Sequence, residues 1–271
     1  MGNKTLTPYF SKVTLKQAWE GDLEPITQNG MPVKQMELLK GICDNPPATA
    51  AAVYDFLAEK DPLFCSIYGT GEQINGEEIF TFPFATGQAI PDSIIEITGP
   101  IGTQVSKCHR ENLFQHIELV ATNLAATDMP ESLAVKLAVL HDIGKKYTSA
   151  TNKVGEICYH GHEKVSAFIV GHWLRHQGYS YKTAQALVAV IYGHMQPATK
   201  WNTKYRWRTG EPVDYKNDFY EELLEYYGNV HLADRTMSII EVLAKCDEGV
   251  TTDINQDVLD KFKRGQNLIR A

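Results

Sequence analysis

The chain has 271 residues, a formal net charge of −7 and 43% hydrophobic residues, a globular composition with enough apolar surface for a core. The negative charge argues against a protein that holds duplex DNA through phosphate contacts alone. Five scattered cysteines without a CxxC pair are typical of reduced intracellular thiols, and no apolar run approaches the roughly 20 residues that span a bilayer. We therefore expect a cytoplasmic protein without a membrane partner.

The chain changes character near residue 100. The residues before it mix one helical pattern with extended patterns and a hairpin signal at Asn75-Gly76, in the order 46–62, 63–69, 72–82 and 93–99. A stretch rich in glycine and proline, 97–104, reads as a linker. The sequence thus predicts a small α+β N-terminal region of unknown role over 1–104, followed by a second domain over 105–271.

Nearly all of the second domain carries helical periodicity. Apolar residues recur at three-to-four spacing in 112–125, 131–144, 163–178, 182–194, 221–228, 230–249 and 257–269. The predicted fold class is therefore mainly α, a helical bundle.

Several polar side chains fall on the apolar stripes of these helices. His116, His141, His194 and Asp234 each share a stripe with aliphatic residues on a different helix, and Asp142 follows His141 directly. A single inward histidine is usually a hydrogen-bonded core residue, but burying this many polar groups without partners would cost several kcal/mol each. A shared cation relieves that cost, because imidazole nitrogen and carboxylate oxygen are its ligands. The pattern predicts a metal at the centre of the bundle.

The same residues carry a family resemblance over roughly 105–250. The order of His116 in LFQHIELV, the pair His141-Asp142 in HDIGK and Asp234 in LADRT resembles the HD-domain superfamily of metal-dependent phosphohydrolases. LADRT is similar to a segment of alarmone hydrolases. The segments YHGHEKVSAF and VAVIYGHMQP resemble histidine segments in the HD domains of bacterial CCA-adding tRNA nucleotidyltransferases. No nucleotidyltransferase motif precedes residue 100, so the CCA-adding activity is not carried over.

The resemblance implies two divalent transition-metal ions (Mn, Fe, Co, Ni or Zn) in one centre. The implied ligands are His116, His141, Asp142, His162, His194 and Asp234. Asp142 would bridge the two ions as a catalytic residue, and together they would activate water against phosphorus. Lys145 would act beside it and bind a phosphate oxygen. The alternative for Lys145 is a solvated lysine at a helix end.

Other polar residues leave alternatives open. Asp247 can replace Asp234 as the last ligand, although LADR is the closer match to the family. His160 is a ligand, a substrate contact or a surface residue. His172 and His176 have the i, i+4 spacing of a metal pair but are expected to be exposed. Glu163 is expected to orient the histidine that precedes it.

The segment KWNTKYRWR (200–208) interleaves basic and aromatic residues. Cationic groups attract phosphates and indole rings stack on bases, so this segment is a candidate cover for a bound nucleotide. The candidate substrate-binding residues are Lys204, Arg206, Trp207 and Arg208. The alternative is a surface loop with aromatic anchors.

The leading function is a metal-dependent phosphohydrolase that cleaves a phosphoester of a nucleotide or of a nucleic-acid end. Expected partners are a nucleotide or another phosphorylated small molecule, with RNA or single-stranded nucleic acid as a further class. Two alternatives remain: a di-iron oxygenase built on the same ligands, and a non-catalytic binding module pinned by its metal.

Overall fold

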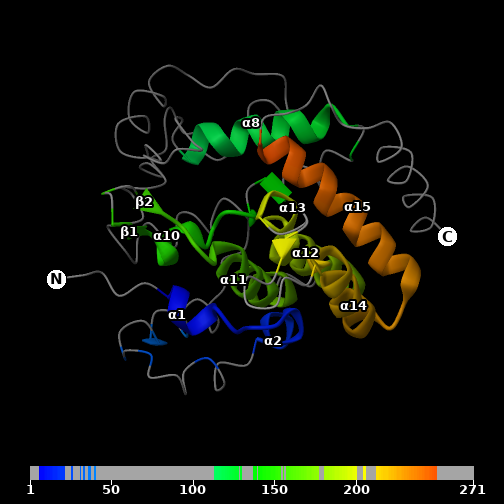
Figure 1. Ribbon diagram of the computed structural model, residues 1–271, viewed down its shortest axis with the longest axis horizontal. Helices are drawn as coiled ribbons and strands as arrows, with labels where there is room; N and C mark the ends of the chain where they lie inside the picture. The colour runs from blue at the N-terminus through cyan, green and yellow to red at the C-terminus, as the bar shows by residue number, and fades with distance from the viewer. Residues whose placement is uncertain are drawn as a thin grey trace.

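The fold comes from a computed structural model, which describes residues 6–21, 113–127, 140–153, 157–176, 180–199, 204–205 and 212–248 together with single positions between these ranges. Within these ranges helices dominate, as predicted (Figure 1). No helix in the described part of the chain is long and apolar enough to cross a membrane.

The centre of the molecule is a packed pair of helices, α11 (His162–His176) and α12 (Tyr181–Gly193). Ser180 starts α12, because its side chain accepts a hydrogen bond from the backbone N–H of Thr183. The second half of α12 is buried on every side, from Leu187 to His194. A helix that is apolar all round belongs in a core, and α12 therefore brings its terminal histidine into the interior.

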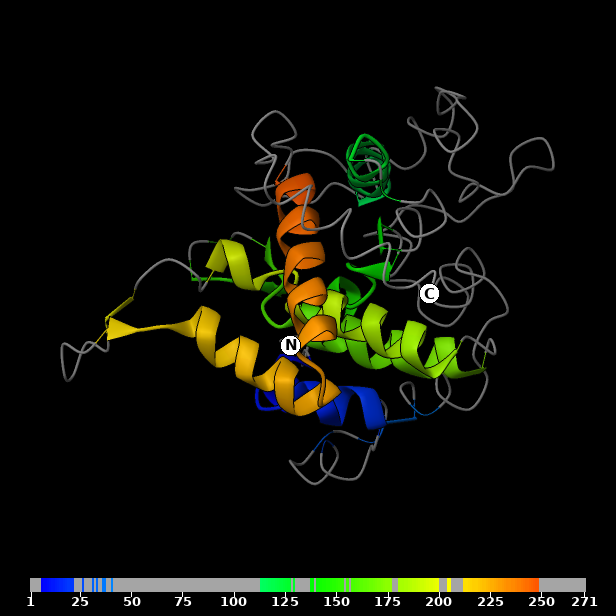
Figure 2. The same ribbon diagram turned by 90° about the vertical axis from the view of Figure 1, so that its right-hand side faces the viewer.

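Two further helices pack against this pair. Helix α14 (Tyr215–Tyr227) ends at Gly228, whose left-handed backbone (φ 59°) stops the helix and turns the chain. Helix α15 (Val230–Asp247) then runs from the end of α14 past α12 to α8 (Leu113–Ala125), so that its C-terminus lies beside α8 (Figures 1 and 2). This course carries residues from opposite ends of α15 into different surroundings.

The remaining described elements are short. Helix α10 (Lys145–Thr148) follows the HDIGK turn, and α13 (Gln196–Thr199) follows α12. Two antiparallel ribbons of two-residue strands pair β1 (Ala150–Thr151) with β2 (Ile157–Cys158) and β3 (Lys204–Tyr205) with β4 (Pro212–Val213). Strands this short leave no trace in a periodicity analysis, so the sequence did not predict them.

The N-terminal segment also packs on the bundle. Its two short helices, α1 (Thr7–Phe10) and α2 (Leu15–Glu20), lie against α11, and α2 also contacts α12 and α14. The packing buries a set of apolar side chains: Leu6, Phe10, Val13, Leu15, Ala18 and Trp19. The predicted strands and hairpin between 63 and 99, and the helices at 46–62 and 257–269, lie outside the described residues. The boundary at residue 104 stays a prediction.

Candidate metal centre

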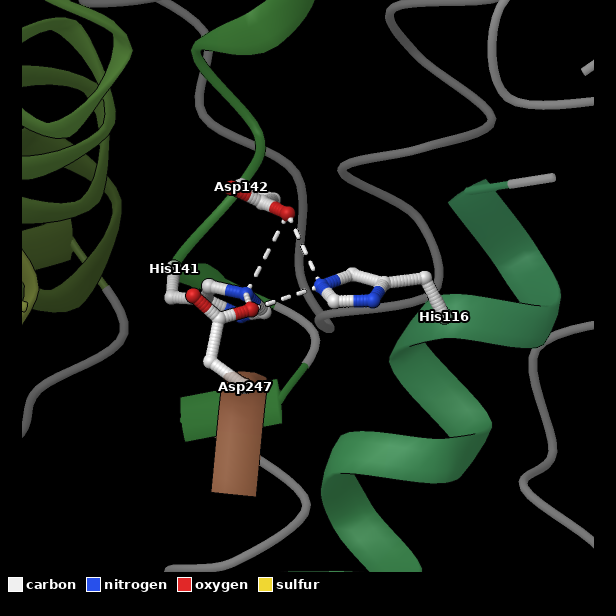
Figure 3. Close-up of side chains that lie close together, drawn as sticks. All are labelled: His116, His141, Asp142 and Asp247. Carbon is white, nitrogen blue, oxygen red and sulfur yellow. Dashed lines mark ion pairs between the residues drawn. The ribbon is translucent and has the colours of Figure 1, made fainter. Parts of the chain in front are cut away.

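Six polar side chains from five parts of the bundle meet at one place. They come from α8, from the turn before α10, from the start of α11, and from the C-terminal ends of α12 and α15: His116, His141, Asp142, His162, His194 and Asp247. Figure 3 shows four of them pointing toward one another, with Asp247 entering from the end of α15. All the histidine rings are buried, and Asp247 is the most exposed of the set at 15%.

The first cluster contains four of these residues, and one ligand-type atom from each lies within 4.8 Å of the others: His116, His141, Asp142 and Asp247. His116 Nε2 is 2.8 Å from Asp247 Oδ1 and 3.4 Å from Asp142 Oδ2. His141 Nε2 is 3.2 Å from Asp142 Oδ2 and 3.5 Å from Asp247 Oδ1. Two imidazole nitrogens therefore face two carboxylate oxygens across a small space.

The second cluster shares Asp142 but uses its other oxygen. His162 Nε2 is 3.1 Å from Asp142 Oδ1, and His194 Nε2 is 4.0 Å from the same atom. The two Nε2 atoms are 3.2 Å apart. Each oxygen of Asp142 thus faces its own pair of histidines, and the carboxylate lies between the two clusters.

Backbone carbonyls fix the direction of three rings. His162 Nδ1 lies 2.8 Å from the carbonyl oxygen of Tyr159, and His194 Nδ1 lies 2.6 Å from that of Ile191. His141 Nδ1 lies 2.9 Å from the carbonyl of Ala138. When Nδ1 donates its proton to a carbonyl, Nε2 keeps a lone pair and points into the cluster, the arrangement in which histidines bind metals.

A glycine brings the two clusters together. Gly144, in the HDIGK turn, donates its backbone N–H to Ser166 Oγ on α11 at 2.8 Å. A Cβ at this position would come within 2.3 Å of the carbonyl oxygen of His162. The turn that carries Asp142 can therefore press against the first turn of α11 only because residue 144 has no side chain.

The charges of the centre are strongly coupled. Burial disfavours the imidazolium form, but the carboxylates of Asp142 and Asp247 outweigh it and raise the pKa of His141 to about 9. Burial also opposes the carboxylate forms, yet the surrounding positive groups hold the pKa of Asp142 and of Asp247 well below its usual value. Burial and the neighbouring imidazoles lower the pKa of His194 to about 3. Without a cation, buried carboxylates must be balanced by protonated histidine.

These residues fit a bound cation. Asp247 Oδ1 and His141 Nε2 are buried, and neither makes a hydrogen bond of normal geometry within the described residues, although the two atoms face each other. Buried polar atoms in this condition are costly, and a cation between them would satisfy both. Mixed imidazole and carboxylate ligands suit divalent transition metals.

Lys145 lies at the edge of the centre. Its side chain is buried, its Nζ is 2.6 Å from Asp142 Oδ2, and it lies over the ring of Tyr159 at 5.7 Å from the ring centre. The alternative of a solvated lysine is therefore wrong. Burial and the negative charge of Asp142 raise the pKa of Tyr159 to about 12, so its phenol remains a proton donor at neutral pH.

The preference for Asp234 as the last ligand needs correction. Asp234 is exposed, and its Oδ1 accepts a hydrogen bond of 2.8 Å from the Tyr220 hydroxyl on α14. It lies in the first half of α15, whereas the end of that helix reaches the cluster and contributes Asp247. The expectation that Asp234 faces the core is wrong, and the alternative residue, Asp247, occupies the expected place.

Other candidates lie away from the two clusters or outside the description. His160 is exposed. His172 is half-buried rather than exposed, and its Nε2 lies 3.0 Å from the carbonyl of Gly21. The closest contact of Glu163 with His162 is 3.9 Å, so the carbonyl of Tyr159, which the sequence did not single out, is the nearer partner of that ring. The side chain of Lys204 lies outside the described part, as do Arg206, Trp207 and Arg208.

Comparison with known proteins agrees with this geometry. The HD domain family model matches residues 109–243, a stretch that includes every histidine of the two clusters and Asp142. Asp247 lies four residues beyond the end of the match. No curated protein and no solved structure matches the chain. Residues 109–243 therefore belong to the HD-domain superfamily of metal-dependent hydrolases.

Proposed function

We propose that this HD domain is a phosphohydrolase that uses two divalent transition-metal ions to cleave a phosphoester of a nucleotide or of a nucleic-acid end. The observation that carries the proposal is the position of Asp142, because each of its oxygens faces a different pair of histidines. His116, His141 and Asp247 would complete one ion site, and His162 and His194 the other.

A pair of cations supplies Lewis-acid chemistry, which polarises a phosphoryl oxygen and makes water a nucleophile near neutral pH. The protein's own groups do the rest. Buried imidazoles with fixed Nδ1 atoms hold the ligand geometry, and the apolar ends of α8, α12 and α15 limit access of bulk water. Lys145 provides a fixed positive charge next to Asp142, where negative charge would build up on a phosphoryl group.

The nucleotide part of the proposal rests on the sequence. The basic and aromatic segment 200–208 follows α13, which itself follows His194 at the end of α12. A segment so connected can cover the centre and stack on a base. The resemblance of the His162 and His194 segments to those of CCA-adding enzymes points to the same substrate class. Free thiols at Cys158 and Cys246 are in keeping with a cytoplasmic enzyme.

The deciding experiment combines elemental analysis of the purified protein with a screen of nucleotides and phosphorylated small molecules for phosphate release. The proposal predicts two equivalents of a divalent transition metal and metal-dependent hydrolysis of at least one nucleotide. Stoichiometric iron with oxygen consumption, and no phosphate release, would instead identify a di-iron oxygenase. Bound metal without either activity would identify a binding module.

Substitution of Lys145 by methionine should lower the kcat for phosphorylated substrates about 100-fold, because one positioned charge next to the reacting group is lost. Metal content should stay at the wild-type level, since methionine fills the same space and Asp142 keeps both oxygens. Steady-state kinetics and elemental analysis of the same preparation test this. Wild-type turnover in this variant would show that Lys145 has no role in the reaction.

Substitution of Trp207 by alanine should raise the KM for nucleotides about tenfold, because one aromatic stacking partner of a base is lost. The KM for a small aryl phosphate should change less than twofold, because that substrate has no base to stack. Trp201 in the same segment offers a matched control. Equal effects on both substrates would show that Trp207 does not read the base.

A further inference from the structure

The N-terminal segment reaches the periphery of the metal centre although it lies far outside the matched stretch. The backbone N–H of Leu6 donates to the carbonyl of Tyr147, in α10 beside the HDIGK turn, at 2.7 Å. The hydroxyl of Thr7 donates to the carbonyl of His160 at 2.8 Å. Two consecutive residues thus bond two parts of the chain near the metal centre: Leu6 bonds α10, which follows His141 and Asp142, and Thr7 bonds the turn that precedes His162.

Thr7 grips the turn that precedes α11. Its hydroxyl holds the carbonyl of His160, and its methyl group would be 3.8 Å from a Cβ placed on Gly161. Gly161 has a left-handed backbone (φ 81°), which lets the chain reverse immediately before His162. Because this turn depends on one glycine and is exposed on its outer side, a hydrogen bond from another segment helps to hold it in one conformation.

The geometry of this turn sets the direction of the His162 ring. Both the backbone N–H and the Nδ1 of His162 lie within hydrogen-bond distance of the carbonyl of Tyr159, at 3.2 and 2.8 Å. A rotation of the turn would separate Nδ1 from that carbonyl and swing Nε2 away from Asp142, which is 3.1 Å away. The direction of one ligand of the second cluster therefore depends on the turn 159–162, in which Thr7 holds the carbonyl next to that of Tyr159.

The segment itself is anchored on α11 independently of Thr7. Lys164 Nζ donates to the carbonyls of Ser11 and Val13 at 2.8 and 2.9 Å, and Arg175 donates to the carbonyl of Trp19. Phe10 is fully buried and forms an edge-to-face contact with Phe168 on α11. The segment that carries Thr7 is therefore held in place by contacts other than those of Thr7.

We propose that Thr7 is a positioning residue for the metal centre: through the carbonyl of His160 it fixes the turn that aims His162 Nε2 at Asp142. This inference rests on the proposed two-ion function. It assigns to Thr7 a role in shaping the second ion site, since the hydroxyl of Thr7 bonds the turn that carries His162.

The test uses Thr7→Val, which keeps the shape and removes the donor, and Thr7→Ser, which keeps the donor. In the metal-free full-length protein, long-range ¹⁵N–¹H spectra should show the Nδ1 proton of His162 in a hydrogen bond to the carbonyl of Tyr159, in wild type and in Thr7→Ser. In Thr7→Val this hydrogen bond should weaken, which moves the Nδ1 proton signal upfield and makes the proton exchange faster with water. Ser11→Ala, which loses a hydroxyl that bonds the carbonyl of Pro8 within the same segment, should match wild type. An unchanged His162 signal in Thr7→Val would overturn the proposal.

A Co²⁺ titration followed by visible absorption supplies a second measurement. Thr7→Val should weaken the second Co²⁺ ion about three- to tenfold, the loss expected from one hydrogen bond, and leave the first ion within twofold of wild type. Equal weakening of both ions would overturn site-selective positioning by Thr7. Wild-type protein that binds no Co²⁺ would overturn the proposed function, while the His162 signal would still decide the role of Thr7.

Discussion

Substitution of Asp142 by asparagine should abolish binding of both metal ions and lower turnover more than about 1,000-fold. The amide keeps the size of the carboxylate but loses the negative charge that faces four imidazoles and Lys145. Without bound cations the nucleophile is ordinary water, whose pKa is about 15.7 rather than about 7. Elemental analysis and a phosphate-release assay on one preparation measure both losses.

The same substitution tests whether Asp142 is a ligand of both ions or of one ion alone. If Asp142 bridges the two ions, asparagine should reduce the metal content from two equivalents to near zero. The corresponding change at His194, to glutamine, should remove only the second ion, because this residue belongs to the second cluster, with its Nε2 4.0 Å from Asp142 Oδ1. A variant of Asp142 that retains one tightly bound ion and normal activity would contradict the bridging role.

Substitution of Asp247 by asparagine should lower the affinity for the metal ion in the first cluster about 100-fold. The same change at Asp234 should leave metal affinity and activity within twofold of wild type. Asp247 Oδ1 lies 2.8 and 3.5 Å from the Nε2 atoms of His116 and His141. Asp234 lies on the surface, and an asparagine there still accepts the hydrogen bond from Tyr220. The two variants carry the same chemical change on the same helix, so each controls for the other.

Isothermal titration with Mn²⁺ or Co²⁺, with thermal unfolding as a check on folding, gives the comparison. A loss of metal in the Asp234 variant with normal binding in the Asp247 variant would reverse the assignment and restore the sequence-based preference. Equal, small effects in both variants would show that neither aspartate of α15 is a metal ligand.

The ambiguity between these two aspartates shows where sequence reasoning reached its limit. They are 13 residues apart, which on an α-helix corresponds to a rotation of about 220° and a rise of about 20 Å. Both therefore cannot face the same neighbour. Asp247 follows the buried Ile240, Leu243 and Ala244 at helical spacing, which is a stripe as clear as the one around Asp234. Two of the residues one turn before Asp234, Val230 and His231, are exposed. The sequence contained this signal, but the match of LADR to the family outweighed it.

The sequence by itself determined the helical class, the order of the ligand-type residues and the inward positions of His116, His141 and His194, because a 3.6-residue period states which side chains share a face. Only the tertiary structure decided which end of α15 meets α8, that the side chain of Lys145 is buried, and that Thr7 touches the turn before His162. These facts depend on how helices cross and where loops meet, and contacts between residues more than a hundred positions apart leave no periodic trace along the chain.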